Sequence, residues 1–343
     1  MKIRVMHVGL GPIGAAVAGQ LLVRRGFQIV GAVDVDPQKV GRDLAEVLGL
    51  GRQLRIRVSD SIRSTIRKTR PDVAVLCTSS SLRVVSRQFE EVLAHRVPIV
   101  TTTEEAAYPT RSNRAVARRI DAAARKANVA VLGTGVNPGF TMDALPIALS
   151  AVCERVDRIE VERVQDARIR RLPFQQKIGA GLTRQQFQTR VEAGTVRHVG
   201  FTESIQMIAD AMGWRLDRIV DRVVPRLAAG PVRSDFVEVA AGQVCGLIQT
   251  GAGYVGDDPK VSLRLEAYLG APESYDAVLI EGSPRIYSKI EGGVHGDIAT
   301  ASITVNSIPA VIAAAPGFHT MRDMRLPSFY PGSLGVSPGV SMP

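Results

Sequence analysis

The sequence predicts an α/β fold that begins with a doubly wound parallel sheet and continues into an α+β domain with a mixed or antiparallel sheet. Three observations support this prediction. An apolar strand near the N-terminus runs directly into three closely spaced glycines and then into a helix. Short apolar strands alternate with helices over the first 141 residues, which is typical of a buried parallel sheet. After Met142 the strands become longer and show polar/apolar alternation, which indicates a sheet with one covered face.

The glycine-rich turn at the N-terminus has the spacing of a dinucleotide-binding motif. In the stretch KIRVMHVGLGPIG, Gly9 permits a tight turn, Gly11 lets the backbone approach a pyrophosphate, and Gly14 lets the following helix pack closely on the strand. The phosphates are then expected at the N-terminus of that helix, where Pro12 and Ile13 also contact the cofactor.

An acidic residue at the end of the second strand completes the motif. The strand 27–33 (FQIVGAV) leads into Asp34, about 20 residues beyond the last glycine, where an acid hydrogen-bonds a ribose hydroxyl. Together these features predict a Rossmann dinucleotide-binding domain. Asp34 opposes a 2′-phosphate, whereas Lys39 and Arg42 follow closely and are able to tolerate it. The predicted cofactor is therefore NAD or NADP, with NAD favoured.

Residues 1–141 are predicted to form the dinucleotide-binding domain, with its ligand site at the carboxyl ends of the strands. The expected strands are 2–8, 27–34, 54–58, 72–77, 97–101 and 129–133, and the expected helices are 12–24, 37–47, 61–68, 82–94 and 111–127.

Residues 142–297 are predicted to form a substrate and oligomerisation domain, whose sheet has an apolar face that a second subunit is expected to cover in a homodimer. Residues 298–325 contain a helix, at 298–314, that is predicted to return to the first domain, and residues 326–343, rich in Pro, Gly and Ser, are predicted to form a loose tail. Within the second domain the expected strands are 156–165, 236–250, 261–269 and 275–281, and the expected helices are 142–152, 183–191, 201–212 and 215–222.

Composition and charge narrow the class of protein. A chain of 343 residues is long enough for two domains. It has no apolar stretch of about 18 residues that predicts a membrane span. Because the first strand begins at Lys2, no room is left for a signal peptide, and a cytoplasmic location is expected. The net charge of +10 is spread along helices among acids, without a nucleic-acid-binding motif, so neither a nucleic acid nor a membrane is an expected partner.

The cysteines and histidines do not indicate a metal site. Cys77, Cys153 and Cys245 are scattered and form no metal-ligand spacing, so no metal and no disulfide scaffold are expected. Cys77 ends an apolar strand and is expected to be a small buried residue. His7 lies inside the first strand and is likewise expected to be structural.

Small hydroxyl residues follow two strands of the predicted parallel sheet. Thr78, Ser79 and Ser80 follow the fourth strand, and Thr102 follows the fifth. We expect these residues to approach the nicotinamide ribose of the cofactor. The alternative is that the serine-rich turn caps the helix 82–94, and both roles are compatible because capping uses only one hydroxyl.

Candidate chemical groups follow the fifth and sixth strands. Glu104 and Glu105 form a carboxylate doublet, in which one member can face the cleft for acid–base chemistry while the other caps a helix or faces solvent. A purely structural acidic cap remains the alternative. Asn137, within a Gly- and Pro-rich turn, either hydrogen-bonds a cofactor amide or the substrate, or belongs to an ordinary interdomain turn.

Motifs distributed through nearly the whole chain resemble those of 2,4-diaminopentanoate dehydrogenase and the related native amine dehydrogenases, whose domain layout is similar to that of dihydrodipicolinate reductase. They are VGLGPIG, GAVDVDPQKVGRDLAEV, TTTEEAAYP, GTGVNPGFTMDALP, QDARIRRLPFQQKIGAGLT, HVGFTESIQMIADAMGW and GGVHGDIATASITVNSIPAVIAAAPGFHTM.

This resemblance implies an NAD(P)-dependent oxidative deamination. An amine on a secondary carbon, such as that of 2,4-diaminopentanoate, becomes a ketone with release of ammonia, and the reverse reaction is a reductive amination of small ketones. The family has a glutamate after the fifth strand that handles the nitrogen. This glutamate matches Glu104, with Glu105 as the competing choice. The residues that resemble the family's substrate pocket are Asn137, Phe140, His198 and His295, with Arg163 and Arg168 as further candidates.

Two alternatives to an amine dehydrogenase remain open at this point. One is a reductase similar to dihydrodipicolinate reductase or homoserine dehydrogenase, and the other is a non-catalytic protein that senses NAD(P). The substrate is also open. A diamino acid requires a clamp for its carboxylate, whereas an apolar pocket walled by Phe140 favours simple aliphatic ketones and amines. The candidates for a carboxylate clamp are Arg163, Arg168, Arg170 and Arg171.

Overall fold

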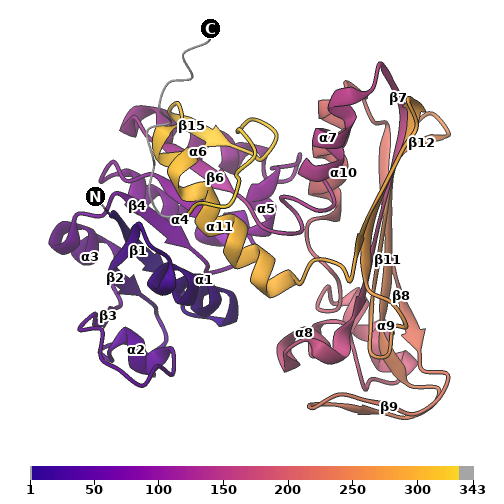
Figure 1. Ribbon diagram of the computed structural model, residues 1–343, viewed down its shortest axis with the longest axis horizontal. Helices are drawn as coiled ribbons and strands as arrows, with labels where there is room; N and C mark the ends of the chain where they lie inside the picture. Colours follow the sequence, from indigo (N-terminus) through magenta and orange to yellow (C-terminus); the bar gives the residue numbers. More distant parts are fainter. Residues whose placement is uncertain (1, 332–343) are drawn as a thin grey trace, which may run out of the picture. The chain divides into compact units, whose positions relative to one another are not determined.

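The protein, described here by a computed structural model over residues 2–331, forms two compact units. Unit 1 comprises Met1–Gly135 and Asp297–Pro343, and unit 2 comprises Val136–Gly296 (Figure 1). The units divide after Gly135 and Gly296, whereas the sequence predicted that the domains would divide after residues 141 and 297. Of the predicted loose tail, residues 326–331 contain no helix or strand, and residues 332–343 lie outside the described part of the chain.

Unit 1 contains a seven-stranded sheet in the order β15-β6-β5-β4-β1-β2-β3, and all of its strand pairs are parallel. The strands are β1 (Ile3–Val8), β2 (Phe27–Val33), β3 (Val58–Ser59), β4 (Val73–Leu76), β5 (Ile99–Thr101), β6 (Ala130–Gly133) and β15 (Gly317–His319). The predicted doubly wound sheet is confirmed. The strand order reverses between β1 and β4, and a ligand crevice is expected beside such a switch point.

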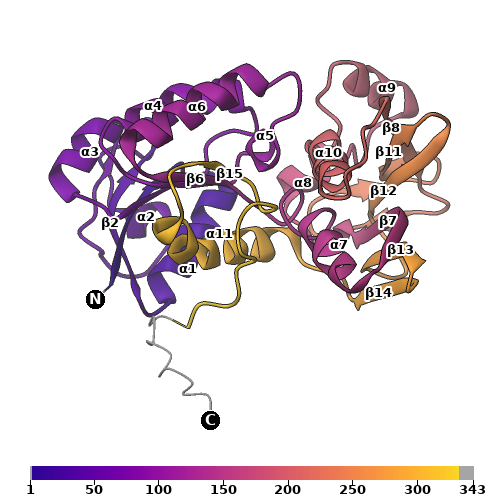
Figure 2. The same cartoon turned by 90° about the horizontal axis from the view of Figure 1, so that it is seen from above.

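Helices cover both faces of this sheet (Figure 2). The helices α3, α4 and α6 pack on one face around a core that includes Met6, Phe89 and Ile120. On the other face, α1 and α11 are joined by hydrogen bonds, including one of 2.9 Å from Gln20 to Ser302. The helices are α1 (Pro12–Val23), α2 (Leu44–Val47), α3 (Ile62–Thr69), α4 (Leu82–Leu93), α5 (Glu104–Ala107), α6 (Arg114–Ala127) and α11 (Gly296–Ala313).

Several elements of unit 1 differ from the sequence prediction: the strand expected at 54–58 is β3 (Val58–Ser59), and the short helix α5 was not predicted. The helix expected at 37–47 is present only as α2, because the carboxylate of Asp43 binds three backbone amides, those of Ala45, Leu54 and Ile56, and holds the preceding residues in turns. The short strand β15 was not predicted, since three residues give no periodicity; it becomes a strand by pairing with β6.

One helix of the described chain, α11, is long and apolar enough to cross a membrane when judged by length and composition alone. This is weak evidence, because core helices of globular proteins pass the same test. Hydrogen bonds from Gln20 to Ser302 and to the carbonyl oxygen of Ile298 join α11 to α1.

Unit 2 contains a six-stranded sheet in the order β14-β13-β7-β12-β11-β8. The central pair, β7 and β12, is parallel, and the other pairs are antiparallel, so the predicted mixed sheet is confirmed. The strands are β7 (Arg155–Asp166), β8 (Arg218–Leu227), β11 (Val244–Val255), β12 (Asp258–Tyr268), β13 (Tyr275–Ser283) and β14 (Ile286–Glu291), with a separate ribbon of β9 (Val232–Arg233) and β10 (Glu238–Val239).

Helices lie on one face of the unit 2 sheet. Two glycines of β11 let α10 approach this face closely. A Cβ atom on Gly251 would lie 2.8 Å from the ring of Phe201, and one on Gly253 would lie 2.7 Å from Ile205. The helical segments are α7 (Ala144–Leu149), η1 (Ser150–Val152), η2 (Ala167–Ile169), α8 (Leu172–Lys177), α9 (Arg184–Glu192) and α10 (Phe201–Ala211).

The prediction of a helix at 215–222 was wrong, since this segment leads into β8. Its apolar residues Ile219, Val220, Val223 and Val224 have the spacing of a helix face. In the structure the segment is an edge strand, with Val224 opposite Ile248 of β11. Pairing with a distant strand, which no local pattern reveals, decides the conformation here.

Candidate functional site

Unit 1 has a pocket of about 700 Å³ at the carboxyl ends of β1, β2 and β4. Its walls include two well-exposed apolar side chains, Val35 and Val84, which suit a flat aromatic base. Of the predicted cofactor residues, the structure brings six to this pocket: Gly9, Gly11, Asp34, Lys39, Thr78 and Ser79.

The three glycines of the turn are required for different reasons. Gly9 has φ +89°, and a Cβ atom there would lie 2.5 Å from the carbonyl oxygen of Cys77. A Cβ atom on Gly14 would lie only 1.9 Å from the carbonyl oxygen of Gly9. In contrast, apart from the adjoining residues of the chain, no described atom lies within 4 Å of the position that a Cβ atom on Gly11 would take. Protein packing therefore explains Gly9 and Gly14 but does not explain Gly11.

Asp34 is held by backbone and side-chain donors. Its Oδ2 atom accepts a hydrogen bond of 2.6 Å from the amide of Leu10, and its Oδ1 atom accepts one of 2.9 Å from the amide of Asp36. The ammonium of Lys39 lies 3.5 Å from Asp34 and 3.2 Å from Asp36. Burial lowers the pKa of Lys39, but its bonds with the two aspartates outweigh burial and raise the pKa overall.

The turn after β4 is organised by hydrogen bonds to α4 and to its own backbone. Thr78 donates to Gln88 at 2.7 Å, and the hydroxyl of Ser79 accepts from the amide of Ser81 at 3.2 Å. Burial raises the pKa of Cys77 to about 12 despite a hydrogen bond with Thr102. The Cys77 thiol is therefore held in its neutral form, although the residue is partly exposed and lines the pocket.

The carboxylate doublet after β5 divides into two different environments. The Oε2 atom of Glu105 accepts a hydrogen bond of 2.8 Å from the amide of Leu82 at the start of α4. Glu105 thereby caps α4, whose preceding residue Ser81 makes no side-chain cap. The neighbouring Glu104 is half-buried, and its carboxylate makes no hydrogen bond or ion pair with any residue in the range 2–331.

Gly133 determines how closely the doublet approaches the sheet. A Cβ atom on Gly133 would lie 2.2 Å from the carbonyl oxygen of Ala106 in α5. The backbone of α5 therefore rests directly on the end of β6. This contact keeps Glu104 at the carboxyl edge of the parallel sheet, where reacting groups of such folds lie.

In unit 2, the turn that contains Asn137 and Phe140 is fixed by Asp143. The buried carboxylate of Asp143 accepts hydrogen bonds from the amides of Gly139 at 2.8 Å and Ala144 at 2.6 Å, so that it closes the turn and caps α7. Burial raises the pKa of Asp143, against the effect of these bonds. Asp143 is a residue that the sequence prediction missed, although its place just before a helix is typical of an N-cap.

The amide of Asn137 offers a buried acceptor. Its Nδ2 atom lies 3.0 Å from the sulfur of Met142, whereas its Oδ1 atom is buried and has no partner among the described residues. The same turn packs against Gly200, where a Cβ atom would lie 2.3 Å from Pro138. This close approach brings the segment after His198 next to the Asn137 turn.

His198 is a neutral, immobilised imidazole. Its backbone exchanges two hydrogen bonds with the side chain of Gln249, of 2.7 and 3.1 Å. Its ring hydrogen-bonds the backbone of Asn137, while its Nε2 atom is buried without a partner in the described part of the chain. Burial lowers the pKa of His198 to about 3, and the nearby cations Lys177 and Arg163 lower it further. His198 therefore offers an acceptor at Nε2 instead of a proton.

Arg163 was predicted to bind substrate, but its guanidinium is engaged inside unit 2. It is 3% exposed and donates to Asp276 at 2.5 Å and to the carbonyl oxygen of Val294 at 2.5 Å. Asp276 also accepts from the amide of Val294 at 2.7 Å. Burial lowers the pKa of Arg163 and raises that of Asp276. The pair anchors the chain that leads into the half-buried His295.

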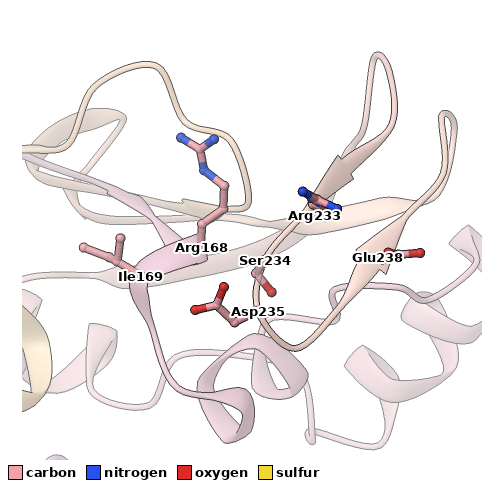
Figure 3. A pocket seen from close by; sticks show the side chains of 6 residues that line it. All are labelled: Arg168, Ile169, Arg233, Ser234, Asp235 and Glu238. Atoms are coloured by element: carbon pink, nitrogen blue, oxygen red, sulfur yellow. The ribbon is translucent and has the colours of Figure 1, made fainter.

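Arg168, the other predicted clamp, lies in a different place from the Asn137 turn. Its side chain is 49% exposed and is paired with Asp166 at 2.6 Å. It lines a separate pocket of about 550 Å³ between η2 and the β9–β10 ribbon (Figure 3). The side chains that share this pocket are Ile169, Arg233, Ser234, Asp235 and Glu238.

Arg170 is the buried arginine of this stretch. Its Nη1 atom donates to Gln165 at 2.8 Å, and its guanidinium stacks 4.0 Å from the centre of the Phe174 ring. A Cβ atom on Gly296 would lie 2.8 Å from Nη2 of Arg170. The structure therefore brings Arg170, and not Arg168, next to the segment that contains His295. The described residues contain no group of three His, Cys, Asp or Glu side chains able to hold a metal ion.

The family, sequence and structure comparisons all find dehydrogenases that act on amines. The C-terminal domain of 2,4-diaminopentanoate dehydrogenases matches residues 140–335. The 2,4-diaminopentanoate dehydrogenase of Acetoanaerobium sticklandii is 34% identical over 333 residues, which cover 95% of this chain and 94% of that protein. The solved amine dehydrogenase of Mycobacterium smegmatis superposes with a TM-score of 0.85 at 27% identity, and covers 97% of this chain and 99% of its own.

A more distant structure shares the fold alone. Dihydrodipicolinate reductase from Paenisporosarcina sp. TG-14 superposes with a TM-score of 0.55 at 14% identity, and covers 94% of this chain and 99% of its own.

The different environments of Gly11 and Gly14 predict different effects of the same substitution. Gly11→Ala is expected to change the free energy of unfolding by less than about 0.5 kcal/mol, because the new methyl group meets no protein atom. It is expected to weaken NADH binding at least about tenfold, because the methyl group occupies the place of a phosphate. Gly14→Ala is expected to destabilise the protein by about 1–3 kcal/mol or more.

Urea unfolding without cofactor and NADH fluorescence titration measure the two effects separately. Unchanged NADH affinity in Gly11→Ala would show that the pyrophosphate lies elsewhere.

Proposed function

This chain belongs to the 2,4-diaminopentanoate dehydrogenase family, and from that premise we propose that it deaminates an amine on a secondary carbon to a ketone and ammonia with NAD(P). It is an oxidoreductase that acts on CH–NH₂ groups, with a nicotinamide cofactor. The reverse reaction is the reductive amination of a small ketone. Unit 1 would bind the cofactor through its glycine turn and Asp34, and unit 2 would supply the substrate-binding residues.

One observation carries the assignment of the reacting group. Of the two adjacent carboxylates, Glu105 caps α4, whereas Glu104 has no partner among residues 2–331 at the carboxyl edge of the sheet. A half-buried carboxylate without a partner is able to bind a cation. The substrate arrives as an ammonium ion, which makes Glu104 the group that fits it.

Glu104 would perform two tasks in sequence. Its carboxylate holds the substrate ammonium and then accepts a proton from it, which frees the nitrogen lone pair to assist departure of hydride from the adjacent carbon. The nicotinamide ring, when bound, supplies the hydride acceptor. In the amination direction the protonated Glu104 returns the proton to nitrogen. Asn137 and His198 offer acceptors for N–H groups and so contribute to orientation.

The charges in unit 2 favour a substrate that carries a carboxylate. Lys177, Arg163 and Arg170 all contribute positive potential at His198. Asp276 neutralises Arg163, whereas Lys177 makes no ion pair with any described residue, so Lys177 is the cation that would bind an anionic group. We therefore propose an amino acid with a second amine, such as 2,4-diaminopentanoate, over a simple aliphatic amine.

The matched variants Glu104→Gln and Glu105→Gln test the central assignment. Glu104→Gln is expected to reduce ammonia-dependent NAD(P)H oxidation with small ketones at least about a hundredfold, because the amide cannot accept the proton. Cofactor affinity is expected to stay within about twofold, as expected for a residue outside the nucleotide pocket. Glu105→Gln keeps an oxygen for the Leu82 amide and is expected to retain activity within about tenfold while losing about 0.5–1 kcal/mol of stability.

The reverse pattern, with activity lost only in Glu105→Gln, would move the catalytic role to Glu105. Full activity in both variants, or ketone reduction that proceeds equally without ammonia, would favour the reductase alternative. An unmodified protein that binds NADH but oxidises none with any ketone would favour the sensor alternative.

The nucleotide pocket favours NAD over NADP. The cations available for a 2′-phosphate are already paired, Lys39 with Asp34 and Asp36, and Arg42 with Glu46 at 2.6 Å. The carboxylate of Asp34 also lines the pocket and would repel the phosphate.

Asp34→Ala is expected to raise the ratio of kcat/KM for NADP to kcat/KM for NAD at least about tenfold, because it removes the repulsion and releases Lys39. Asp36→Ala is the matched control, because Asp36 also pairs with Lys39 but does not line the pocket. In this variant the ratio of kcat/KM for NADP to kcat/KM for NAD is expected to change less than about threefold. Equal ratios in the two variants would exclude Asp34 as the residue that recognises the ribose.

We also propose a homodimer formed through the helix-free face of the unit 2 sheet. Because Gly251 and Gly253 face α10, the intervening Ala252 points to the opposite face, together with its partner Val220. Cross-strand pairs extend this row across the whole sheet: Val220, Ala252, Ser262, Glu160, Leu279 and Tyr287.

Light scattering is expected to give twice the chain mass of 36.8 kDa. Val220→Asp is expected to give monomers, because it replaces an exposed apolar side chain of this face by a charge, whereas Val23→Asp on the exposed side of α1 is expected to leave the dimer intact. A monomeric unmodified protein would refute this arrangement.

A further inference from the structure

A fully buried histidine lies beneath the glycine turn. His7 is in β1, where the strand approaches its end, and its side chain is 0% exposed. Its Nε2 atom lies 3.0 Å from the carbonyl oxygen of Gly9. Since a carbonyl oxygen only accepts, Nε2 carries the hydrogen and donates it. Burial lowers the pKa of His7 to about 4, so the ring is neutral and this N–H is the single donor that it has.

The bond from His7 holds one end of a particular peptide group. The carbonyl of the Gly9–Leu10 peptide accepts from His7, and the amide of the same peptide donates to Asp34 at 2.6 Å. His7 therefore binds the carbonyl end of this peptide, and Asp34 binds its amide end. Asp34 is the residue that would recognise the ribose.

The peptide needs such a restraint because of its conformation. Gly9 has φ +89°, and glycine reaches many backbone conformations at little cost. If the Gly9–Leu10 peptide rotated, its amide would turn away from Asp34 and its carbonyl would turn toward the pocket. The carboxylate would lose its shortest hydrogen bond, and a carbonyl oxygen would point at the phosphates.

We propose that His7 is a positioning residue for the dinucleotide: its N–H fixes the Gly9–Leu10 peptide, which in turn orients Asp34 toward the ribose. His7 touches neither the substrate nor the reacting atoms. The proposal rests on the proposed nucleotide site of unit 1, and it does not depend on the chemistry at Glu104.

The test measures NADH binding directly by fluorescence titration, which needs no amine or ketone. His7→Leu is expected to weaken NADH binding about tenfold, because the peptide loses its donor. His7→Gln is expected to stay within about threefold of the unmodified protein, since the glutamine amide places an N–H near the position of Nε2. His7→Asn, with a shorter reach, is expected to resemble His7→Leu and replaces it if that variant does not fold.

Two further measurements separate positioning from general stability. Val5→Ala, two residues earlier on the same buried strand, is expected to lower the melting temperature without changing the dissociation constant for NADH. In an Asp34→Ala background, His7→Leu is expected to weaken NADH binding less than about twofold further, because its effect passes through Asp34.

The proposal is overturned if His7→Leu or His7→Asn, folded as judged by circular dichroism, binds NADH like the unmodified protein. It is also overturned if the effects of His7 and Asp34 substitutions multiply independently, or if His7→Gln binds as poorly as His7→Asn. Loss of the proposed amine chemistry would instead appear as absent ammonia-dependent turnover with normal NADH binding.

Discussion

The hydrogen bond between Glu105 and the amide of Leu82 gives the two adjacent glutamates of unit 1 different environments. It joins the start of α4, just beyond the turn after β4, to the short helix after β5. It also engages Glu105, one of the two adjacent glutamates, in capping α4. This bond fixes the direction of the Glu105 carboxylate. Glu104, without such a partner in residues 2–331, is the carboxylate that remains available to bind a cation.

In unit 2, buried polar groups fix the positions of chain segments. The Arg163–Asp276 pair is almost fully enclosed, and such pairs contribute little net stability because desolvation offsets their attraction. Losing one partner is costly, however, since a charge then stays buried alone. The pair therefore acts mainly on position: both members bind the backbone of Val294 and hold the segment that leads into His295.

Unit 2 places neutral acceptors beside cations. Oδ1 of Asn137 and Nε2 of His198 are buried without a partner among the described residues, and Lys177, Arg163 and Arg170 contribute positive potential at His198. The neutrality of His198 is part of the same arrangement, since a protonated ring beside three cations would be strongly disfavoured.

The sequence by itself determined the features that depend on neighbouring residues. The glycine turn, Asp34 and the alternation of strands and helices are local patterns, and they were sufficient to predict the parallel sheet and its ligand edge. Tertiary structure decided whatever depends on a distant partner. It made 218–227 an edge strand through pairing with β11, it separated Glu104 from Glu105 through an amide 23 residues away, and it engaged Arg163 with Asp276, 113 residues further along the chain. Partners this far apart in sequence leave no trace in local periodicity, because only folding brings them within hydrogen-bonding distance.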